Sequence, residues 1–311
     1  MAASKKRPRW GDLPVSARAA IERLIAGPVV AAQNCAGGFS PGFASRLTLA
    51  DGCRVFVKAM DVDEWPEEAI SHRAEATVAA ALPDSVPAPR FLGCDDDGQW
   101  VILAFDCIDG AEPAQPWDPA DLDRVVAAAG QLSQALTPSP IALPRDHPRL
   151  GGWAGLASDP ARCRLLPAHF SWAAEHLSQL IKLEEEGLLA AHGSSLVHFD
   201  LYPHNILLTP ERVLFVDWPH ARLCAPYIDL LTLLSSAAGD GFDPEPILGA
   251  HSLTAGIEPH TIDAVLAAHA GFCVGGALYP ASPGLEPIIE AKLSLSRGPI
   301  EWLQRRLSRH R

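Results

Sequence analysis

The sequence lacks the excess of positive charge that marks most proteins that bind nucleic acid. Its 25 Lys and Arg residues stand against 37 Asp and Glu, which gives a formal net charge of −12. A protein that follows a nucleic-acid duplex normally carries the opposite sign, so we expect no nucleic-acid partner. The acidity would suit a cationic small molecule, and it would serve solubility equally well.

Cysteine is present, but it lacks the spacing of a zinc knuckle or of a disulfide framework. The seven cysteines are scattered, odd in number and never arranged as CxxC. Such a pattern is typical of reduced thiols, so we expect a cytoplasmic protein without disulfides.

Long apolar runs are lacking as well. The basic segment MAASKKRPRWGDLP is followed by charged residues such as Arg18 and Glu22, so we expect no export signal. The longest uncharged run, 264–285, contains His269 together with several glycines and prolines, which disfavour a membrane span. We therefore expect a soluble protein with no membrane partner.

What the sequence does contain is enough apolar material for one large or two modest domains, with 48% hydrophobic residues in 311. The first ten residues look like a loose arm. The following part predicts a small lobe, residues 1–106, in which an antiparallel sheet is combined with one main helix. Its expected elements are a short amphipathic helix over 11–26, strands over 46–49, 54–59, 90–93 and 99–105, and a helix over 67–82.

Beyond a Pro-rich connector at 111–119 the pattern becomes mostly helical, which predicts a second lobe over 107–311. A single β-hairpin interrupts it, with strands over 205–208 and 213–218. The charge run Glu184 to Glu186 predicts a solvated helix face. The expected helices are 121–136, 169–192, 225–238, 259–277 and 285–310.

The segment LVHFDLYPHNILLTPERVLFVDWPHA, residues 196–221, carries the most informative chemistry. Asp200 and Asn205 lie five residues apart in a polar loop that leads into the hairpin, and Asp217 closes the second strand. Hard oxygen donors of this kind suit Mg²⁺, which takes one or two carboxylates together with substrate phosphates. The spacing is that of the kinase catalytic loop HxDxxxxN, followed by a metal-binding Asp.

A kinase site also requires a lysine on a strand after a Gly-rich turn and a helical carboxylate that holds it. Lys58 lies on the expected strand after GGFSPGF, and Glu75 lies on the following helix. The Gly-rich turn alone is a weak signal, because glycine could equally serve a tight hairpin. A connector between lobes follows at 104–110. The elements therefore occur in the order that phosphoryl transfer needs.

Over residues 30–240 the chain resembles the aminoglycoside phosphotransferase family, whose members phosphorylate antibiotics and other small molecules. The resemblance implies an α+β, bilobal protein-kinase-like fold that binds Mg²⁺ and uses ATP or GTP as phosphate donor. It also implies a role for each matching residue of this sequence. Asp200 would position or deprotonate the acceptor hydroxyl, Asn205 and Asp217 would hold Mg²⁺, and His198 and Asp229 would support the catalytic loop. The residues that would bind the nucleotide are Lys58, Glu75, Gly38, Ser40, Ala104, Phe105 and Cys107. Those that would contact the acceptor are Tyr202, His204, Asp240 and Asp243.

The loop departs from the family's usual HGDLHPGN at three positions, where Phe199, Tyr202 and His204 stand in place of Gly, His and Gly. The walls of the acceptor site are therefore expected to differ. Trp218 and Pro219 follow Asp217 in place of the Phe-Gly of an Asp-Phe-Gly motif, which argues against a protein kinase with a switchable segment.

These features predict an enzyme that transfers the γ-phosphate of ATP or GTP to a hydroxyl of a small molecule. The first expectation is an aminoglycoside, a basic peptide or a nucleoside antibiotic as acceptor, which would give resistance or self-protection. A metabolic kinase that acts on choline, a sugar or an amino alcohol remains an alternative. A catalytically weak nucleotide-binding module is the third possibility, and the retention of Asp200 speaks against it.

Overall fold

The computed structural model describes residues 7–35, 41–143, 149–279 and 286–309 of the chain. These residues divide into two compact units. We call the described parts of Lys5–Pro113 and Pro203–Ala221 the sheet unit, and those of Ala114–Tyr202 and Arg222–Arg311 the helical unit. This division differs from the predicted boundary at 106/107, because the segment with the hairpin belongs to the sheet unit although it follows much of the helical unit in sequence.

The sheet unit is built on five antiparallel strands in the order β1-β2-β3-β5-β4. The four predicted strands and both predicted helices are present, whereas β1 was not predicted. Residues 7–10 were expected to form a loose arm, but Asn34 Nδ2 of β1 donates to the carbonyl of Pro8 at 3.1 Å, and the ring of Trp10 lies 6.1 Å from that of Phe43 on β2. The elements are a 3₁₀ turn (Trp10–Asp12), α1 (Val15–Leu24), β1 (Val29–Asn34), β2 (Phe43–Leu49), β3 (Arg54–Asp61), α2 (Pro66–Ala79), β4 (Phe91–Asp96) and β5 (Trp100–Asp106).

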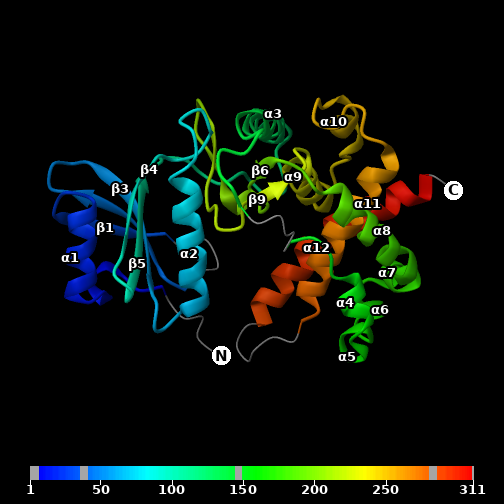
Figure 1. Cartoon of the computed structure of the whole chain (residues 1–311), viewed down its shortest axis with the longest axis horizontal. Coiled ribbons are helices and arrows are strands. Elements are labelled where there is room, and N and C mark those ends of the chain that lie inside the picture. The colour runs from blue at the N-terminus through cyan, green and yellow to red at the C-terminus, as the bar shows by residue number, and fades with distance from the viewer. Residues whose placement is uncertain (1–6, 36–40, 144–148, 280–285, 310–311) are drawn as a thin grey trace. The chain divides into compact units, whose positions relative to one another are not determined.

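The two helices α1 and α2 cover opposite faces of this sheet (Figure 1). Strand β5 shows why, since side chains alternate between the two faces of a strand. Ile102 and Ala104 pack with α1, whereas Val101 and Leu103 pack with α2. The strand is therefore apolar at every position from Trp100 to Phe105 because both of its faces are buried.

The predicted hairpin is present in the sheet unit, although its strands are shorter than expected. A 3₁₀ turn (Pro203–Asn205) leads into β7 (Ile206–Leu208), which pairs with β8 (Val213–Phe215). Ala111 and Leu208 exchange backbone hydrogen bonds of 3.0 and 2.8 Å, and Phe215 N donates to the carbonyl of Pro87 at 2.7 Å. The hairpin is thereby fixed to the two connectors that flank β4 and β5.

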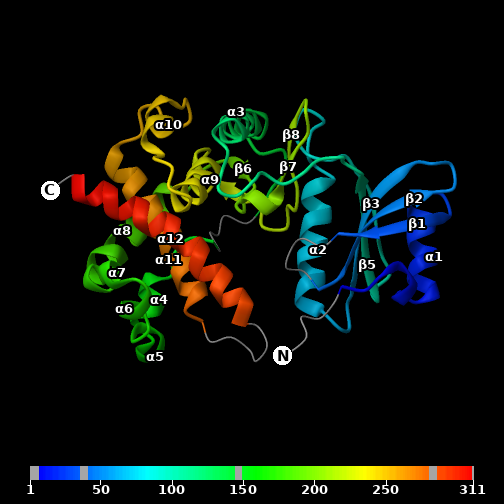
Figure 2. The same cartoon turned by 180° about the vertical axis from the view of Figure 1, so that it is seen from behind.

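The helical unit contains a second strand pair and ten of the described helices (Figure 2). The pair, β6 (Ser195–Val197) with β9 (Arg222–Cys224), flanks the hairpin segment in sequence and was not predicted. Such three-residue strands are too short to give an alternating pattern. The helices are α3 (Pro119–Ala135), α4 (Trp153–Ala157), α5 (Pro160–Cys163), α6 (Leu166–His169), α7 (Ser171–Glu175), α8 (Leu177–Ala190), α9 (Ile228–Gly239), α10 (Glu245–Ala250), α11 (Pro259–Ala277) and α12 (Glu286–Arg309).

The prediction of one continuous helix over 169–192 was also wrong. The backbone leaves the helical region at Phe170 (φ −142°, ψ 69°) and again at His176 (φ −109°, ψ 12°), which separates α6, α7 and α8. Phe170 is buried. Local propensity favours helix throughout this stretch, so tertiary packing sets where the helices end.

Helix α8 packs closely against α11, and a glycine makes the approach possible. A Cβ on Gly187 would lie 2.1 Å from the carbonyl oxygen of Ala264. The neighbouring Glu184 is buried, and its carboxylate accepts hydrogen bonds from Gly152 N and Trp153 N, both at 2.7 Å. The prediction of a solvated face thus holds for Glu185 and Glu186 and is wrong for Glu184, which caps the first turn of α4.

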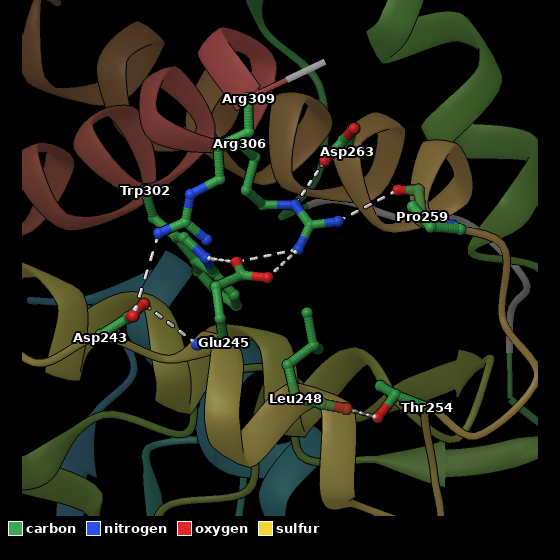
Figure 3. Close-up of polar contacts among 9 residues, drawn as sticks. All are labelled: Asp243, Glu245, Leu248, Thr254, Pro259, Asp263, Trp302, Arg306 and Arg309. Atoms are coloured by element: carbon green, nitrogen blue, oxygen red, sulfur yellow. Dashed lines mark hydrogen bonds and ion pairs between the residues drawn. The ribbon is translucent and has the colours of Figure 1, made fainter.

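A buried arginine ties the C-terminal helix α12 to α10 and α11 (Figure 3). Arg306 Nε donates to Asp263, and Nη1 donates to both carboxylate oxygens of Glu245 at 2.9 and 2.8 Å. Its Nη2 donates to the carbonyl of Pro259 at 3.3 Å, and Trp302 Nε1 donates to Glu245 at 2.6 Å. The cation is thus paired and hydrogen-bonded, as a buried charge must be.

Two further predictions concern the chain as a whole. The seven cysteines, all of which lie within the described residues, form no disulfide with one another. Among the described helices, none is long and apolar enough to cross a membrane.

Candidate functional site

Three predicted site residues meet in the sheet unit around the ammonium group of Lys58. Lys58 lies on β3, and its Nζ donates to the carboxylate oxygens of Glu75 on α2 at 2.8 and 2.9 Å. It also donates to Oδ1 of Asp217, which follows β8, at 2.9 Å. Residues 159 positions apart in sequence are thereby joined in one charge cluster.

The three side chains of the cluster differ in their exposure to solvent. The side chain of Glu75 is 3% exposed, that of Lys58 16% and that of Asp217 46%. Burial opposes the charged form of Lys58, but the carboxylates of Asp217 and Glu75 outweigh it and raise the pKa of Lys58 above its ordinary value. The lysine is therefore a fixed cation. Glu75 holds it from the buried side, and Asp217 faces solvent.

His72 lies one turn before Glu75 on α2 and is buried. Burial and the positive charge of Lys58 lower its pKa to about 4, while its Nδ1 lies 3.1 Å from the carbonyl oxygen of Glu68. The His72 imidazole is therefore neutral at neutral pH and adds no charge to the Lys58 cluster.

The hairpin brings Asn205 and Asp217 to the same end of β7 and β8. Val216 N donates to the carbonyl of Asn205 at 2.9 Å, so the residue before Asp217 is paired with Asn205. Asp217 has a positive φ of 70°, which is uncommon for a residue other than glycine and which is typical of functional sites. The two side chains offer amide and carboxylate oxygens, the donors that Mg²⁺ prefers.

Asn205 and Asp217 would supply only part of the ligands of a metal ion. Among the described residues, no group of three or more His, Cys, Asp or Glu side chains could hold a metal ion. Mg²⁺ keeps several water or phosphate ligands and needs only one or two protein carboxylates. Asn205 and Asp217 therefore fit Mg²⁺, and they do not form a complete cage of the kind that Zn²⁺ takes.

The loop that carries Asp200 lies in the helical unit and is fixed by Asp229 on α9. The carboxylate of Asp229 accepts hydrogen bonds from His198 N at 2.7 Å and Phe199 N at 2.8 Å. Burial raises the pKa of Asp229, and the two backbone donors offset part of that effect. Phe199 adopts φ 67°, a conformation that costs a non-glycine residue about 1–2 kcal/mol, so the family's glycine at this position has a steric reason.

Asp200 has a charged partner that no motif predicted. Arg149 Nη1 donates to Asp200 Oδ1 at 2.7 Å, and the Arg149 guanidinium lies 5.5 Å from the ring centroid of Phe272 on α11. Both side chains of the ion pair are largely shielded, at 20% and 13% exposed. Arg149 comes from a Pro-rich loop with no recognisable pattern, so sequence reasoning could not have found it.

Behind Asp200, Tyr202 is packed into the helical unit. Its hydroxyl lies 3.3 Å from His269 Nε2 and 3.6 Å from Cys273 Sγ, both on α11. Burial lowers the pKa of His269 to about 4 and raises the pKa of Cys273 to about 11. Tyr202 is almost inaccessible, so its predicted contact with an acceptor would require movement. His269 and Cys273 were missed because single residues on an apolar helix give no signal.

The remaining predicted residues are placed as follows. Ala104 and Phe105 are buried at the end of β5, Cys107 follows them and is half-buried, and His204 is half-buried in the turn before β7. Gly38 and Ser40 lie outside the described residues. Asp240 accepts a hydrogen bond from Trp117 N at 3.1 Å, and Asp243 lies 4.0 Å from Arg309. The acidic pair therefore has structural partners, and its contact with an acceptor stays a prediction.

Comparison with known proteins places the chain in a family. A family model described as the phosphotransferase enzyme family matches residues 32–259. No curated protein sequence is significantly similar to the chain. Among solved structures, the chain is similar to a choline/ethanolamine kinase family protein from Mesorhizobium loti, with 17% identity, a TM-score of 0.59 and 94% of each chain covered.

Two aminoglycoside phosphotransferase structures are similar to the same degree. One, from Alicyclobacillus acidocaldarius, shares 14% identity at a TM-score of 0.56, with 93% of this chain and 95% of that chain covered. The other is a thermostable mutant in ternary complex with ADP and hygromycin B, with 12% identity, a TM-score of 0.58, and 94% and 99% covered. These likenesses confirm the predicted α+β, kinase-like fold with its five-stranded sheet and helical C-terminal region. Because the family model spans most of the sequence, the chain belongs to the phosphotransferase enzyme family and is a kinase-type phosphotransferase that acts on small molecules.

Proposed function

We propose that this protein transfers the γ-phosphate of ATP or GTP to a hydroxyl of a small-molecule antibiotic, of the aminoglycoside, basic peptide or nucleoside type. The observation that carries the proposal is the cluster in which Lys58 is held by Glu75 and Asp217. A strand lysine fixed by a helical carboxylate is the arrangement that phosphoryl transfer uses to bind nucleotide phosphates. Resistance or self-protection would be the biological result.

On the donor side, Lys58 would contact the α and β phosphates, and Glu75 would orient it. Gly38 and Ser40 would contribute to phosphate binding, and Ala104, Phe105 and Cys107 would contact the base. Asn205 and Asp217 would hold Mg²⁺. When bound, this ion would neutralise part of the phosphate charge and orient the phosphates.

On the acceptor side, Asp200 would orient the attacking hydroxyl and accept its proton. Two features support that role: Asp229 holds the backbone on the N-terminal side of Asp200, and Arg149 holds its carboxylate in one orientation. Catalysis would then come chiefly from alignment of the hydroxyl and from stabilisation of phosphate charge by fixed cations. Tyr202, His204, Asp240 and Asp243 remain candidate acceptor contacts.

The test is a coupled assay for release of ADP or GDP in the presence of Mg²⁺. The panel contains aminoglycosides, peptide and nucleoside antibiotics, choline and sugars. Asp200→Ala is the inactive control, and Asp123→Ala is the matched control, because Asp123 is an exposed carboxylate on α3. Release that one antibiotic stimulates, and that only Asp200→Ala abolishes, would support the proposal.

A metabolic kinase that acts on choline, a sugar or an amino alcohol is the second candidate, and one observation favours it. The carboxylate of Asp200 is paired with Arg149, and the carboxylate of Asp240 accepts a hydrogen bond from Trp117 N. A polycationic antibiotic needs several available carboxylates, whereas a neutral hydroxyl compound does not. Stimulation by a sugar and not by aminoglycosides would decide for this candidate. Nucleotide binding without any stimulation would instead indicate a module that only binds.

A further inference from the structure

Two arginines of the helical unit lie against the C-terminal part of α11. The Arg149 guanidinium lies 5.5 Å from the ring centroid of Phe272, and the Arg162 guanidinium, on α5, lies 4.8 Å from that of Tyr279. Arg162 Nη2 also donates to the carbonyl of Gly275. Because Phe272 and Gly275 are three residues apart, they share one face of the helix, and the two arginines contact it about one turn apart.

Most hydrogen-bond donors of these two arginines have no acceptor within the described residues. A guanidinium has five N–H donors. Arg149 donates to one oxygen of Asp200, and Arg162 donates to the carbonyl of Gly275. Arg162 Nε is buried and has no acceptor in the described part of the chain. Arg162 is half-buried, and partial burial of a cation is costly unless an anion compensates it, so its position suits an anionic ligand.

The carboxylates that lie near this face have other partners. Glu184 accepts hydrogen bonds from the backbone N–H groups of 152–154 at the start of α4. Asp159 accepts from the backbone N–H groups of Ala161 and Arg162 at the start of α5. Both therefore stabilise the start of a helix, and within the described ranges neither forms an ion pair with either guanidinium group.

The surface between the two aromatic rings is open. Gly276 lies four residues after Phe272 and three before Tyr279, so it belongs to the same face. A Cβ on Gly276 would meet no described atom within 4 Å. Tyr279 is 64% exposed. Room for a ligand group is therefore present between the two arginines, and the ion pair of Arg149 places Asp200 next to it.

We infer that Arg149 and Arg162 form an anion subsite beside Asp200, which binds a carboxylate or phosphate group of the acceptor; this inference rests on the proposed function. Both groups present oxygen atoms that a planar guanidinium can bind two at a time. The acceptor would then be a hydroxyl compound that also carries a negative charge. Peptide and nucleoside types with an acidic group fit this subsite, whereas an aminoglycoside, which is a polycation, does not.

The first experiment uses acetate and inorganic phosphate as probes and follows the arginine Nε–H signals by NMR. The full chain is saturated with MgADP, so that phosphate does not enter the donor site. Arg149→Lys and Arg162→Lys each remove one signal and thereby assign it. We expect a saturable shift of the Arg149 and Arg162 signals with at least one anion, and the tighter anion identifies the acidic group. The signal of Arg164, an exposed arginine two residues after Arg162, should not shift.

The second experiment measures release of ADP or GDP with acceptors that differ in charge. Glucose is compared with glucuronate and glucose phosphate, uridine with uridine monophosphate, and kanamycin serves as the polycation. We expect an anionic compound to give the highest kcat/KM. Arg162→Ala should raise its KM roughly tenfold at nearly unchanged kcat, as expected for the loss of a charge-assisted contact away from the reacting atoms. Arg164→Ala is the matched control and should keep the wild-type KM.

The other outcomes separate this inference from the proposed function. If neither anion shifts the Arg149 and Arg162 signals more than that of Arg164, the subsite does not exist. If kanamycin is the best acceptor and Arg162→Ala keeps its KM, the inference is wrong and the proposed function stands. If the anions shift both signals but no compound is phosphorylated, the proposed function fails and the subsite stands. Thermal unfolding of each variant verifies that the proteins compared are folded.

Discussion

The sheet unit and the helical unit hold their site residues in contrasting ways. In the sheet unit, Lys58, Glu75 and Asp217 are joined directly by their charged side chains. In the helical unit, Asp229 holds the backbone of the loop that carries Asp200, and Arg149 is the added ionic partner. The residue types of the Lys58 cluster, and their order along the chain, are those that phosphoryl transfer requires. Arg149 belongs to no such pattern, so the acceptor-side environment must be read from the structure.

The largest expected effect comes from Asp200→Ala, which would remove the predicted base from the helical unit. We expect turnover to fall by about 10²- to 10⁴-fold, the usual contribution of a positioned general base. Nucleotide binding should not change, because the Lys58 cluster lies in the other unit. Steady-state rates and nucleotide calorimetry would be measured on the same preparation. Equal losses in nucleotide binding and turnover would show that Asp200 contributes to nucleotide binding as well as to catalysis, which would contradict the assignment.

Arg306→Ala should have the largest effect on the stability of the helical unit. It would leave the buried carboxylate of Asp263 without its cation and detach α12 from Glu245 on α10. Loss of one partner of a buried ion pair costs about 3–5 kcal/mol, and chemical denaturation would measure it. Arg309→Ala is the matched control, because Arg309 is exposed and its pair with Asp243 is long, at 4.0 Å. A similar loss of stability in Arg306→Ala and Arg309→Ala would show that the buried contacts of Arg306 do not stabilise the helical unit.

Asp217→Ala should weaken nucleotide binding, the property that Asp200→Ala is expected to leave unchanged. We expect the Mg²⁺-dependent part of ATP binding to be lost, roughly a hundredfold change, because Asp217 is the predicted metal ligand and a partner of Lys58. Titration with ATP at several Mg²⁺ concentrations would show it. A variant that binds ATP with unchanged Mg²⁺ dependence would show that Asp217 is not the ligand.

The smallest effect concerns pH, and it should appear in both units. The pKa of His72 in the sheet unit and of His269 in the helical unit is lowered from 6.5 to about 4. Below pH 6.5 the unfolded chain therefore binds protons that the folded chain does not, so stability falls as the pH falls from 6.5 towards 4. At pH 5.5 each histidine should cost about 1.4 kcal/mol relative to neutral pH.

Denaturation curves at pH 7.5 and 5.5 would measure this difference for the wild type, His72→Gln and His269→Gln. Each variant should lose less stability on acidification than the wild type. An unchanged pH dependence in His269→Gln would show that this histidine is protonated in the folded protein.

Much of the fold could be predicted because long elements carry strong periodic signals. The alternation in β3 and the apolar face of α3 indicated their elements within a few residues. The breaks at Phe170 and His176 could not be predicted, since they depend on contacts distant in sequence. The strands β6 and β9 escaped notice because three residues are too few to show a period.

The candidate site divides in the same way. The order of Lys58, Glu75, Asp200, Asn205 and Asp217 was sufficient to predict phosphoryl transfer, because that chemistry requires those groups in that sequence of elements. Arg149 could not be predicted, since an isolated arginine is most often a solvated surface residue. Only its ion pair with Asp200 connects it to the candidate site.

The most direct test of the central claim follows labelled phosphate from γ-labelled ATP in the presence of Mg²⁺ and the acceptor panel. We predict that the wild type forms a labelled small molecule and that Asp200→Ala binds MgATP but forms none. A wild type that binds MgATP and labels no compound, or an Asp200→Ala variant that labels one at the wild-type rate, would contradict the account.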